Sequence, residues 1–136
     1  MHEKTVVNTF VLVHGGFHGG WCWHHVAKAL RARGHSVFTP TQTGCGERAH
    51  LISKSITLDT FVDDIANVFL WEDLRDVILV GHSFGGNAIS GVADRMPERT
   101  ALLLKMSTAT TFPRSVQNAS SDILTMFFFA GMARRA

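Results

Sequence analysis

A serine between glycines, in the stretch Gly81–Gly85, is the clearest candidate for chemistry in this sequence. The apolar run Val77–Val80 precedes it, and the helix-compatible run Gly86–Ala93 follows it. G-x-S-x-G between a strand and a helix is typical of a sharp turn that exposes a nucleophilic serine. Such a turn strains the serine backbone, and bulky residues two positions away would clash. We therefore predict Ser83 as the nucleophile and the backbone N–H of Phe84, at the helix N-terminus, as an oxyanion donor.

A second glycine-rich loop lies upstream. The short apolar segment Thr9–Val13 has the composition of a buried parallel strand, and it leads into His14–Trp21. A strand that ends in H-G-G is typical of a loop that supplies a second oxyanion donor, because a backbone without Cβ approaches a substrate oxygen closely. Each motif alone is weak, and an ordinary glycine-rich connection is the alternative. Two such loops in this order, each after an apolar strand, favour the catalytic interpretation.

Together these segments resemble the α/β-hydrolase superfamily, and within it the branch of small esterases and hydroxynitrile lyases. The resemblance covers about residues 5–105 and rests on Phe10–Trp23, Gly34–Pro40, Thr43–Arg48, Asp76–Gly86 and Pro97–Arg99. It implies that the backbone N–H of Gly16 is the second oxyanion donor, with Phe17 as the alternative. Phe17 and Phe84 are candidates for lining the acyl pocket, with core packing as the alternative for each. His14 is a possible pocket residue, although stabilisation of its loop by hydrogen bonds to backbone is the better interpretation of its role.

Strands and helices alternate along the first part of the chain. We predict strands at residues 9–13, 35–39, 76–80 and 100–105 and helices at 21–33, 57–69 and 84–95. This order predicts an α/β fold with a doubly wound, mostly parallel sheet of α/β-hydrolase type, and both motifs then lie at carboxyl ends of strands. Thr57 is the expected N-cap of the second helix. The expected buried stripes are Val26, Ala29 and Leu30 on the first helix, and Leu58, Phe61, Ile65 and Val68 on the second.

Length and composition exclude several classes of protein. The 136 residues suggest one domain, and 46% hydrophobic residues with a net charge of +2 indicate a soluble globular chain. Basic residues form no block, which excludes a nucleic-acid interface, and the longest late apolar run, Met126–Ala130, is too short to span a membrane. The two cysteines, Cys22 and Cys45, form no C-x-x-C, and no H-E-x-x-H occurs, so we expect neither metal nor cofactor. With no secretory signal visible, we expect reduced thiols and a cytoplasmic location, with a disulfide as the alternative.

The rest of a catalytic triad is missing from the expected place. In this fold the order is Ser, then Asp or Glu, then His, yet every histidine lies at or before His82. His82 is adjacent to Ser83 and should point away from its hydroxyl, so neither it nor His14 is assigned as the base. The carboxylates after Ser83 are Asp94, Glu98 and Asp122; we expect the first two to be solvated, which leaves the third as the late candidate acid.

We therefore divide the chain into residues 1–105, the N-terminal part of an α/β-hydrolase domain, and 106–136, a divergent tail. Within the tail, residues 106–113 are loop-like, and 121–135 are compatible with a short amphipathic helix. The sheet would then be incomplete, with an exposed edge that permits self-association. Three explanations stay open: a truncated or frame-shifted product, a short relative whose histidine comes from a partner, and a catalytically inactive binding protein.

The predicted function is that of a serine hydrolase that acts on a small carboxylic ester through an acyl-enzyme on Ser83. Whether the chain as it stands is active is left open, because the triad histidine, and with it the acid, is not found. The alternatives are a non-catalytic binding or interaction remnant, and a hydroxynitrile-lyase-like activity in a full-length relative.

Overall fold

The computed structural model describes residues 6–106 of the chain. Its centre is a sheet of four parallel strands in the order β2-β1-β3-β4. The strands are β1 (Thr9–Val13), β2 (Ser36–Phe38), β3 (Val77–His82) and β4 (Thr100–Met106). The helices are α1 (His24–Ala32), α2 (Leu58–Trp71) and α3 (Gly85–Arg95), with short 3-10 turns at Gly20–Trp23, Gly46–Leu51 and Pro97–Arg99. The tail predictions, including Asp122, lie outside the described residues.

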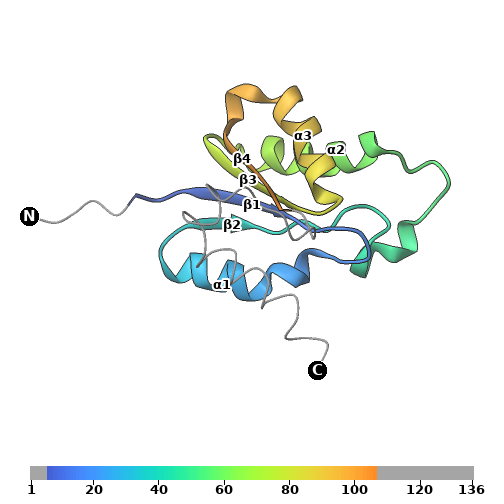
Figure 1. Ribbon diagram of the computed structural model, residues 1–136, viewed down its shortest axis with the longest axis horizontal. Helices are drawn as coiled ribbons and strands as arrows, with labels where there is room; N and C mark the ends of the chain where they lie inside the picture. Colours follow the sequence, from blue (N-terminus) through green and yellow to red (C-terminus); the bar gives the residue numbers. More distant parts are fainter. Residues whose placement is uncertain (1–5, 107–136) are drawn as a thin grey trace, which may run out of the picture.

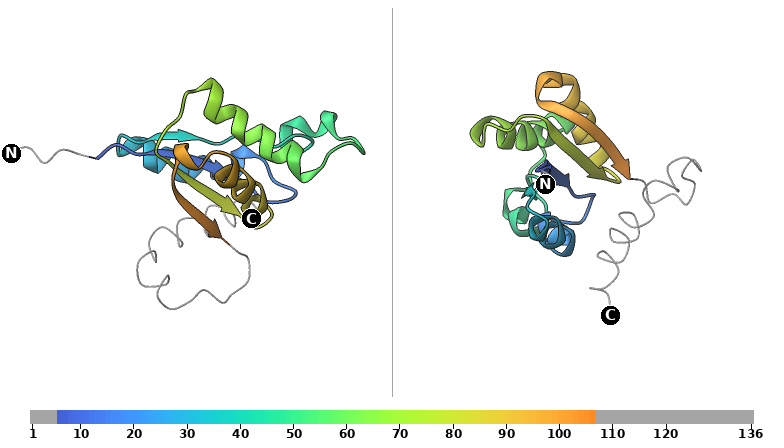
Figure 2. Two further views of the ribbon diagram at one scale, coloured as in Figure 1. Left: turned by 90° about the horizontal axis from the view of Figure 1, so that it is seen from above. Right: turned by 90° about the vertical axis from the view of Figure 1, so that its left-hand side faces the viewer.

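The helices cover both faces of the sheet, as Figures 1 and 2 show. α1 lies on one face and α2 and α3 on the other, which is the doubly wound arrangement that the alternating elements predict. The predicted fold class is therefore confirmed. One core cluster joins β1 and β3 to α2 and α3, and its largest fully buried side chains are Phe69, Ile65, Leu79 and Ile89. A smaller cluster under α1 contains Leu12, Trp23, Val26, Ala27, Val37 and Val80.

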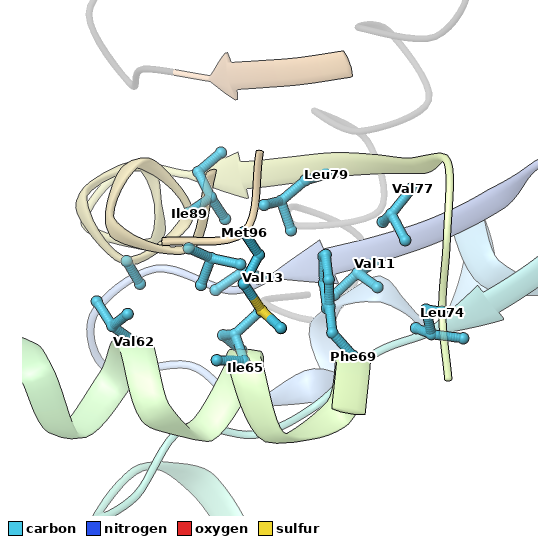
Figure 3. Packing of buried hydrophobic residues seen from close by; sticks show 13 residues of the cluster. Val11, Val13, Val62, Ile65, Phe69, Leu74, Val77, Leu79, Ile89 and Met96 are labelled. Atoms are coloured by element: carbon cyan, nitrogen blue, oxygen red, sulfur yellow. The ribbon is translucent and has the colours of Figure 1, made fainter. Parts of the chain in front are cut away.

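The buried stripe of α2 is offset from the predicted one. Thr57 is the N-cap, as expected, and its backbone N–H donates to Oγ1 of Thr60 at 3.0 Å. Leu58, however, is 46% exposed. The buried side chains are Val62, Ile65, Ala66 and Phe69, while Phe61 and Val68 are only partly buried. Figure 3 shows this stripe directed toward the side chains of β1 and β3.

The first predicted helix is divided into two parts. A 3-10 turn precedes α1, and the chain leaves the helix through Gly34, whose φ of +90° suits glycine. Val26 and Ala27 are buried and Leu30 packs against them, whereas Ala29 is only partly buried. The face that meets the sheet therefore includes Ala27 in place of the predicted Ala29.

β4 is the edge strand opposite β2, and among the described residues it pairs with β3 alone. Leu102 and Leu104 are 49% and 42% exposed on it. Self-association through this edge stays a prediction, as does the division of the chain at residue 105. Within residues 6–106, no helix combines the length and the apolar character that crossing a bilayer requires.

Candidate active site

Ser83 occupies the turn between β3 and α3, with its backbone in the left-handed region at φ 53°. Both flanking glycines are sterically required. A Cβ atom on Gly81 would lie 2.7 Å from the carbonyl oxygen of Gly85, and one on Gly85 would lie 2.6 Å from that of His14. The chain therefore turns too tightly here for any side chain at these two positions, while the side chain of Ser83 remains exposed.

The strained turn is held from both sides. The backbone N–H of Ser83 donates to the carbonyl oxygen of Met106, the last residue of β4, at 2.6 Å, and Gly86 donates to the carbonyl of Ser83 at 2.9 Å. The N–H of Phe84, just before α3, has no hydrogen-bond partner among residues 6–106. A free amide at a helix N-terminus is suited to stabilising negative charge.

The second glycine-rich loop lies directly beside this turn. A Cβ atom on Gly15 would lie 3.2 Å from Cβ of Ser83 and 3.0 Å from the carbonyl oxygen of His82. The next residue, Gly16, is exposed, and a Cβ atom there would meet nothing within 4 Å. Its N–H, like that of Phe84, lacks a hydrogen-bond partner in the described part of the chain. One free amide thus directly follows Ser83, and another lies on the loop that packs against it; their assignment as oxyanion donors stays a prediction.

The two phenylalanines of the loops differ in their surroundings. Phe17 is fully exposed and has φ 62°. Phe84 is 42% exposed, and its ring packs edge-on against Phe61 at a centroid distance of 5.7 Å. Their assignment to a substrate pocket stays a prediction.

His14 is fully buried, and both of its ring nitrogens contact backbone atoms. Burial lowers its pKa, although the carbonyl of Gly15 and, more weakly, the carboxylates of Glu47 and Asp64 act in the opposite direction. His82 is half-buried, and burial together with the charge of His18 lowers its pKa. Both rings are therefore neutral near pH 7.

Neither of the later carboxylates that the structure describes forms a hydrogen bond or an ion pair with a residue of the serine turn. Asp94 on α3 and Glu98 in the turn after it are exposed, as expected. Asp122 falls in the part that is not described, so the described residues contain a candidate nucleophile and two candidate oxyanion donors without a complete triad. Among residues 6–106, no three His, Cys, Asp or Glu side chains lie close enough together to hold a metal ion.

The loop after β2 contributes a polar network that the sequence motifs do not indicate. Gln42 is 1% exposed, and its backbone N–H and side-chain amide donate to Nε2 and the carbonyl oxygen of His14 at 2.9 Å and 3.0 Å. Thr43 donates twice to the carboxylate of Asp64, at 2.6 Å each. No spacing rule links residues so far apart in the chain; the one available signal is a run of polar residues directly after a strand.

A surface cavity of about 470 Å³ lies between the end of β2 and α2. None of its lining residues belongs to the two glycine-rich loops, and they include Phe38, Asp64, Asn67 and Trp71. We therefore place the candidate site at Ser83, where the free amides are, and not in this cavity.

Comparison with known proteins agrees with the motifs. A model of the alpha/beta hydrolase family matches residues 10–135. A carbendazim hydrolyzing esterase from Nocardioides sp. (strain SG-4G) is 54% identical over 95 residues, which are 70% of this chain and 39% of that protein. Methylesterase 8 of Arabidopsis thaliana is 31% identical over 127 residues, 92% of this chain and 45% of that protein. The chain thus spans less than half the length of these two relatives.

Solved structures show the same relationship. An extracellular alpha/beta-hydrolase from a Paenibacillus species has a TM-score of 0.68 and 29% identity, over 85% of this chain and 53% of that chain. Polyneuridine aldehyde esterase also has a TM-score of 0.68, with 28% identity, over 75% of this chain and 41% of that chain. The parallel sheet, the strained serine turn and the family match lead to one conclusion: the chain belongs to the alpha/beta hydrolase family.

Proposed function

We propose that Ser83 is the nucleophile of an esterase that acts on small carboxylic esters. The observation that supports this most directly is the exposed serine at φ 53°, beside the free amides of Phe84 and Gly16. Relatives named as an esterase and as methylesterases support the substrate class.

In the proposed reaction, Oγ of Ser83 attacks the ester carbonyl carbon and its proton passes to a base. The N–H groups of Phe84 and Gly16 hold the oxyanion that forms. The bond to the leaving alcohol then breaks, the alcohol takes up the proton, and water later releases the acid from the acyl-enzyme. No histidine of the chain follows Ser83, and neither His14 nor His82 is assigned as the base, so the described residues supply the nucleophile and the oxyanion donors of this reaction without its base.

The test is hydrolysis of p-nitrophenyl acetate by the purified 136-residue chain. We expect p-nitrophenol release and an acetyl group on Ser83 by mass spectrometry, and loss of both in Ser83→Ala. Ser90→Ala is the matched control, because Ser90 lies on the same helix and its hydroxyl donates to the carbonyl of Gly86 at 2.8 Å. Without a base the rate will be low, so each variant is compared with the rate in buffer.

Equal rates for the chain, both variants and buffer would contradict catalysis by this chain and favour a non-catalytic binding protein. Equal turnover in the chain and in Ser83→Ala, both above buffer, would show that another group performs the hydrolysis.

A further inference from the structure

One face of the sheet is only partly covered by helices. Directly paired residues of parallel strands share a face, and Leu104 of β4 pairs with Val80 of β3, as Leu102 pairs with Ile78. This is the face on which α1 packs, because Val80 belongs to the core cluster under that helix (Figure 1). Val80 is 2% exposed, whereas Leu102 and Leu104 are 49% and 42% exposed. The cover that α1 provides therefore ends short of these two leucines.

The opposite face of β4 differs, because helices cover it. Leu103 pairs with Leu79 there and packs against the core cluster that joins β1 and β3 to α2 and α3. The exposed leucines thus belong to one side of the strand. They form an apolar strip with two partly buried neighbours on the same face, and the members of this open strip are Ile78, Leu102, Leu104 and Met106. None of these side chains carries a charge, so the strip is suited to an apolar partner.

The chain itself continues from one end of the open strip. Met106 is the last residue of β4, and residues 107–136 follow it, outside the described residues. Within 121–135, four apolar side chains share one face at helical spacing, namely Ile123, Leu124, Phe127 and Phe128. Apolar side chains at this density are stabilised by leaving water. The sequence after β4 therefore contains an apolar helical face, and the sheet beside it contains an apolar strip without a cover.

The lengths of the segments are compatible with contact between the two. Residues 107–120 can span about 45 Å when extended, at about 3.3 Å per residue, whereas neighbouring strands are only about 4.8 Å apart. The connection is therefore long enough to turn back from Met106 over the face of β4. A helix over residues 121–135 would be about 22 Å long, and β4, with seven residues, is about as long. One helix could thus lie along the whole open strip.

We propose that residues 121–135 form a helix that packs on the open strip, beside α1 on the same face of the sheet. The apolar face of this helix contacts Leu102 and Leu104 and removes them from water. The strip is then covered within one chain, without a second copy and without any further segment of a longer relative. This inference concerns packing alone and is independent of catalysis at Ser83.

The test is hydrogen–deuterium exchange of the 136-residue chain, read by mass spectrometry on peptides from residues 121–133. Leu104→Asp places a carboxylate in the middle of the open strip. Leu70→Asp is the matched control, because Leu70 is 53% exposed on α2 and lies outside the strip. Peptides from β1 and β3 report in each protein whether the sheet is folded. Leu104→Ala is a milder variant that removes apolar area without adding charge.

We expect the amides of 121–133 to exchange at least about tenfold more slowly in the unchanged chain than the intrinsic rate of that sequence. Leu104→Asp should bring them to within about threefold of the intrinsic rate, and Leu104→Ala should have a smaller effect in the same direction. Leu70→Asp should leave them as they are. The sheet peptides should remain protected in all four proteins.

Exchange of 121–133 at the intrinsic rate in the unchanged chain would overturn the proposal. Equal protection in Leu104→Asp and Leu70→Asp would also overturn it, because the segment would then pack elsewhere. Protection that is lost on dilution would assign the strip to a second copy of the chain instead. If Leu104→Asp also exposes the sheet peptides, Leu104→Ala decides: faster exchange confined to 121–133 supports the proposal, and unchanged exchange overturns it.

Discussion

Gly91 on α3 lies directly against Val62 on α2: a Cβ atom on Gly91 would lie 2.5 Å from Cγ2 of Val62. The missing side chain lets the two helices approach closely above the sheet. An ion pair between Arg95 and Asp63, at 2.5 Å, joins the same two helices at the surface. Because this pair is exposed, the packed contact contributes more to the free energy of unfolding.

Gly91→Ala should destabilise the protein although alanine favours helices. Helix propensity contributes about 1 kcal/mol in favour of alanine, but overpacking against a β-branched side chain costs about 1–3 kcal/mol. Val62→Ala alone should cost roughly 1–3 kcal/mol by leaving a cavity. The double variant should be less destabilised than the sum of the two, as measured by urea unfolding. Simple additivity would show that the two side chains do not compete for the same space.

Gly85→Ala and Gly86→Ala are neighbouring changes with opposite expected results. The new Cβ at position 85 would lie 2.6 Å and 2.7 Å from the carbonyl oxygens of His14 and Val13, which are backbone atoms that cannot move aside. The new Cβ at position 86 would lie 3.6 Å from the side chain of Lys105, an ordinary contact. We expect a loss above about 3 kcal/mol for Gly85→Ala and a neutral or slightly stabilising effect for Gly86→Ala. Thermal unfolding of both variants checks this, and similar melting temperatures would contradict it.

Stability should fall as the pH decreases from about 7 to 5. Burial lowers the pKa of His14 and of His82 from the ordinary value of 6.5. The unfolded chain therefore binds protons below pH 6.5 that the folded chain does not bind. The contribution of the two histidines to the free energy of unfolding is complete above that pH, and it decreases as the pH falls toward their pKa values in the folded protein. Urea unfolding at several pH values measures the slope, which should be shallower in His14→Gln than in the unchanged chain. Equal slopes would show that His14 does not contribute.

Cys22, one of two cysteines that are free thiols in the structure, should be unreactive toward alkylation while the protein is folded. Burial raises the pKa of Cys22 to about 12, and it raises that of Cys45 as well, with a further effect from the charge of Asp64. Since the thiolate is the reactive form, iodoacetamide at pH 8 should modify Cys22 only after unfolding in urea. Mass spectrometry of the alkylated protein identifies the modified residue. Modification of Cys22 in the folded protein at the rate seen in urea would contradict this, as would a disulfide between the two residues.

The sequence predicts the elements well wherever local chemistry decides them. The apolar runs before each motif are strands, Thr57 caps α2, and Ser83 takes the strained conformation that the flanking glycines suggest. The buried stripe of α2 is less predictable. Leu58 and Phe61 match helical spacing as well as Val62 and Phe69 do, and which set is buried depends on where α3 and the sheet lie.

The contact between Gln42 and His14 cannot be predicted from local sequence either, because it also depends on how distant elements pack. It joins the loop after β2 to the end of β1, and these segments meet only because the two strands pair in parallel. A glutamine in a polar loop is ordinarily solvated, so its residue type does not predict burial. The structure reveals its role because it shows what the amide contacts.

The hydrogen bond from Ser83 to Met106 has a consequence for the order of folding. A pentapeptide of the sequence Gly81–Gly85 has no partner for that amide, and nothing local opposes relaxation of the serine to a negative φ. The partner is the last residue of β4, so the turn acquires its anchor only after this strand has been synthesised and has paired with β3. A ribosome-bound chain that ends before β4 would carry the complete motif without the hydrogen bond that anchors the Ser83 amide. The conformation of the serine turn is thus completed at the edge of the sheet, by a strand that follows the turn in the chain.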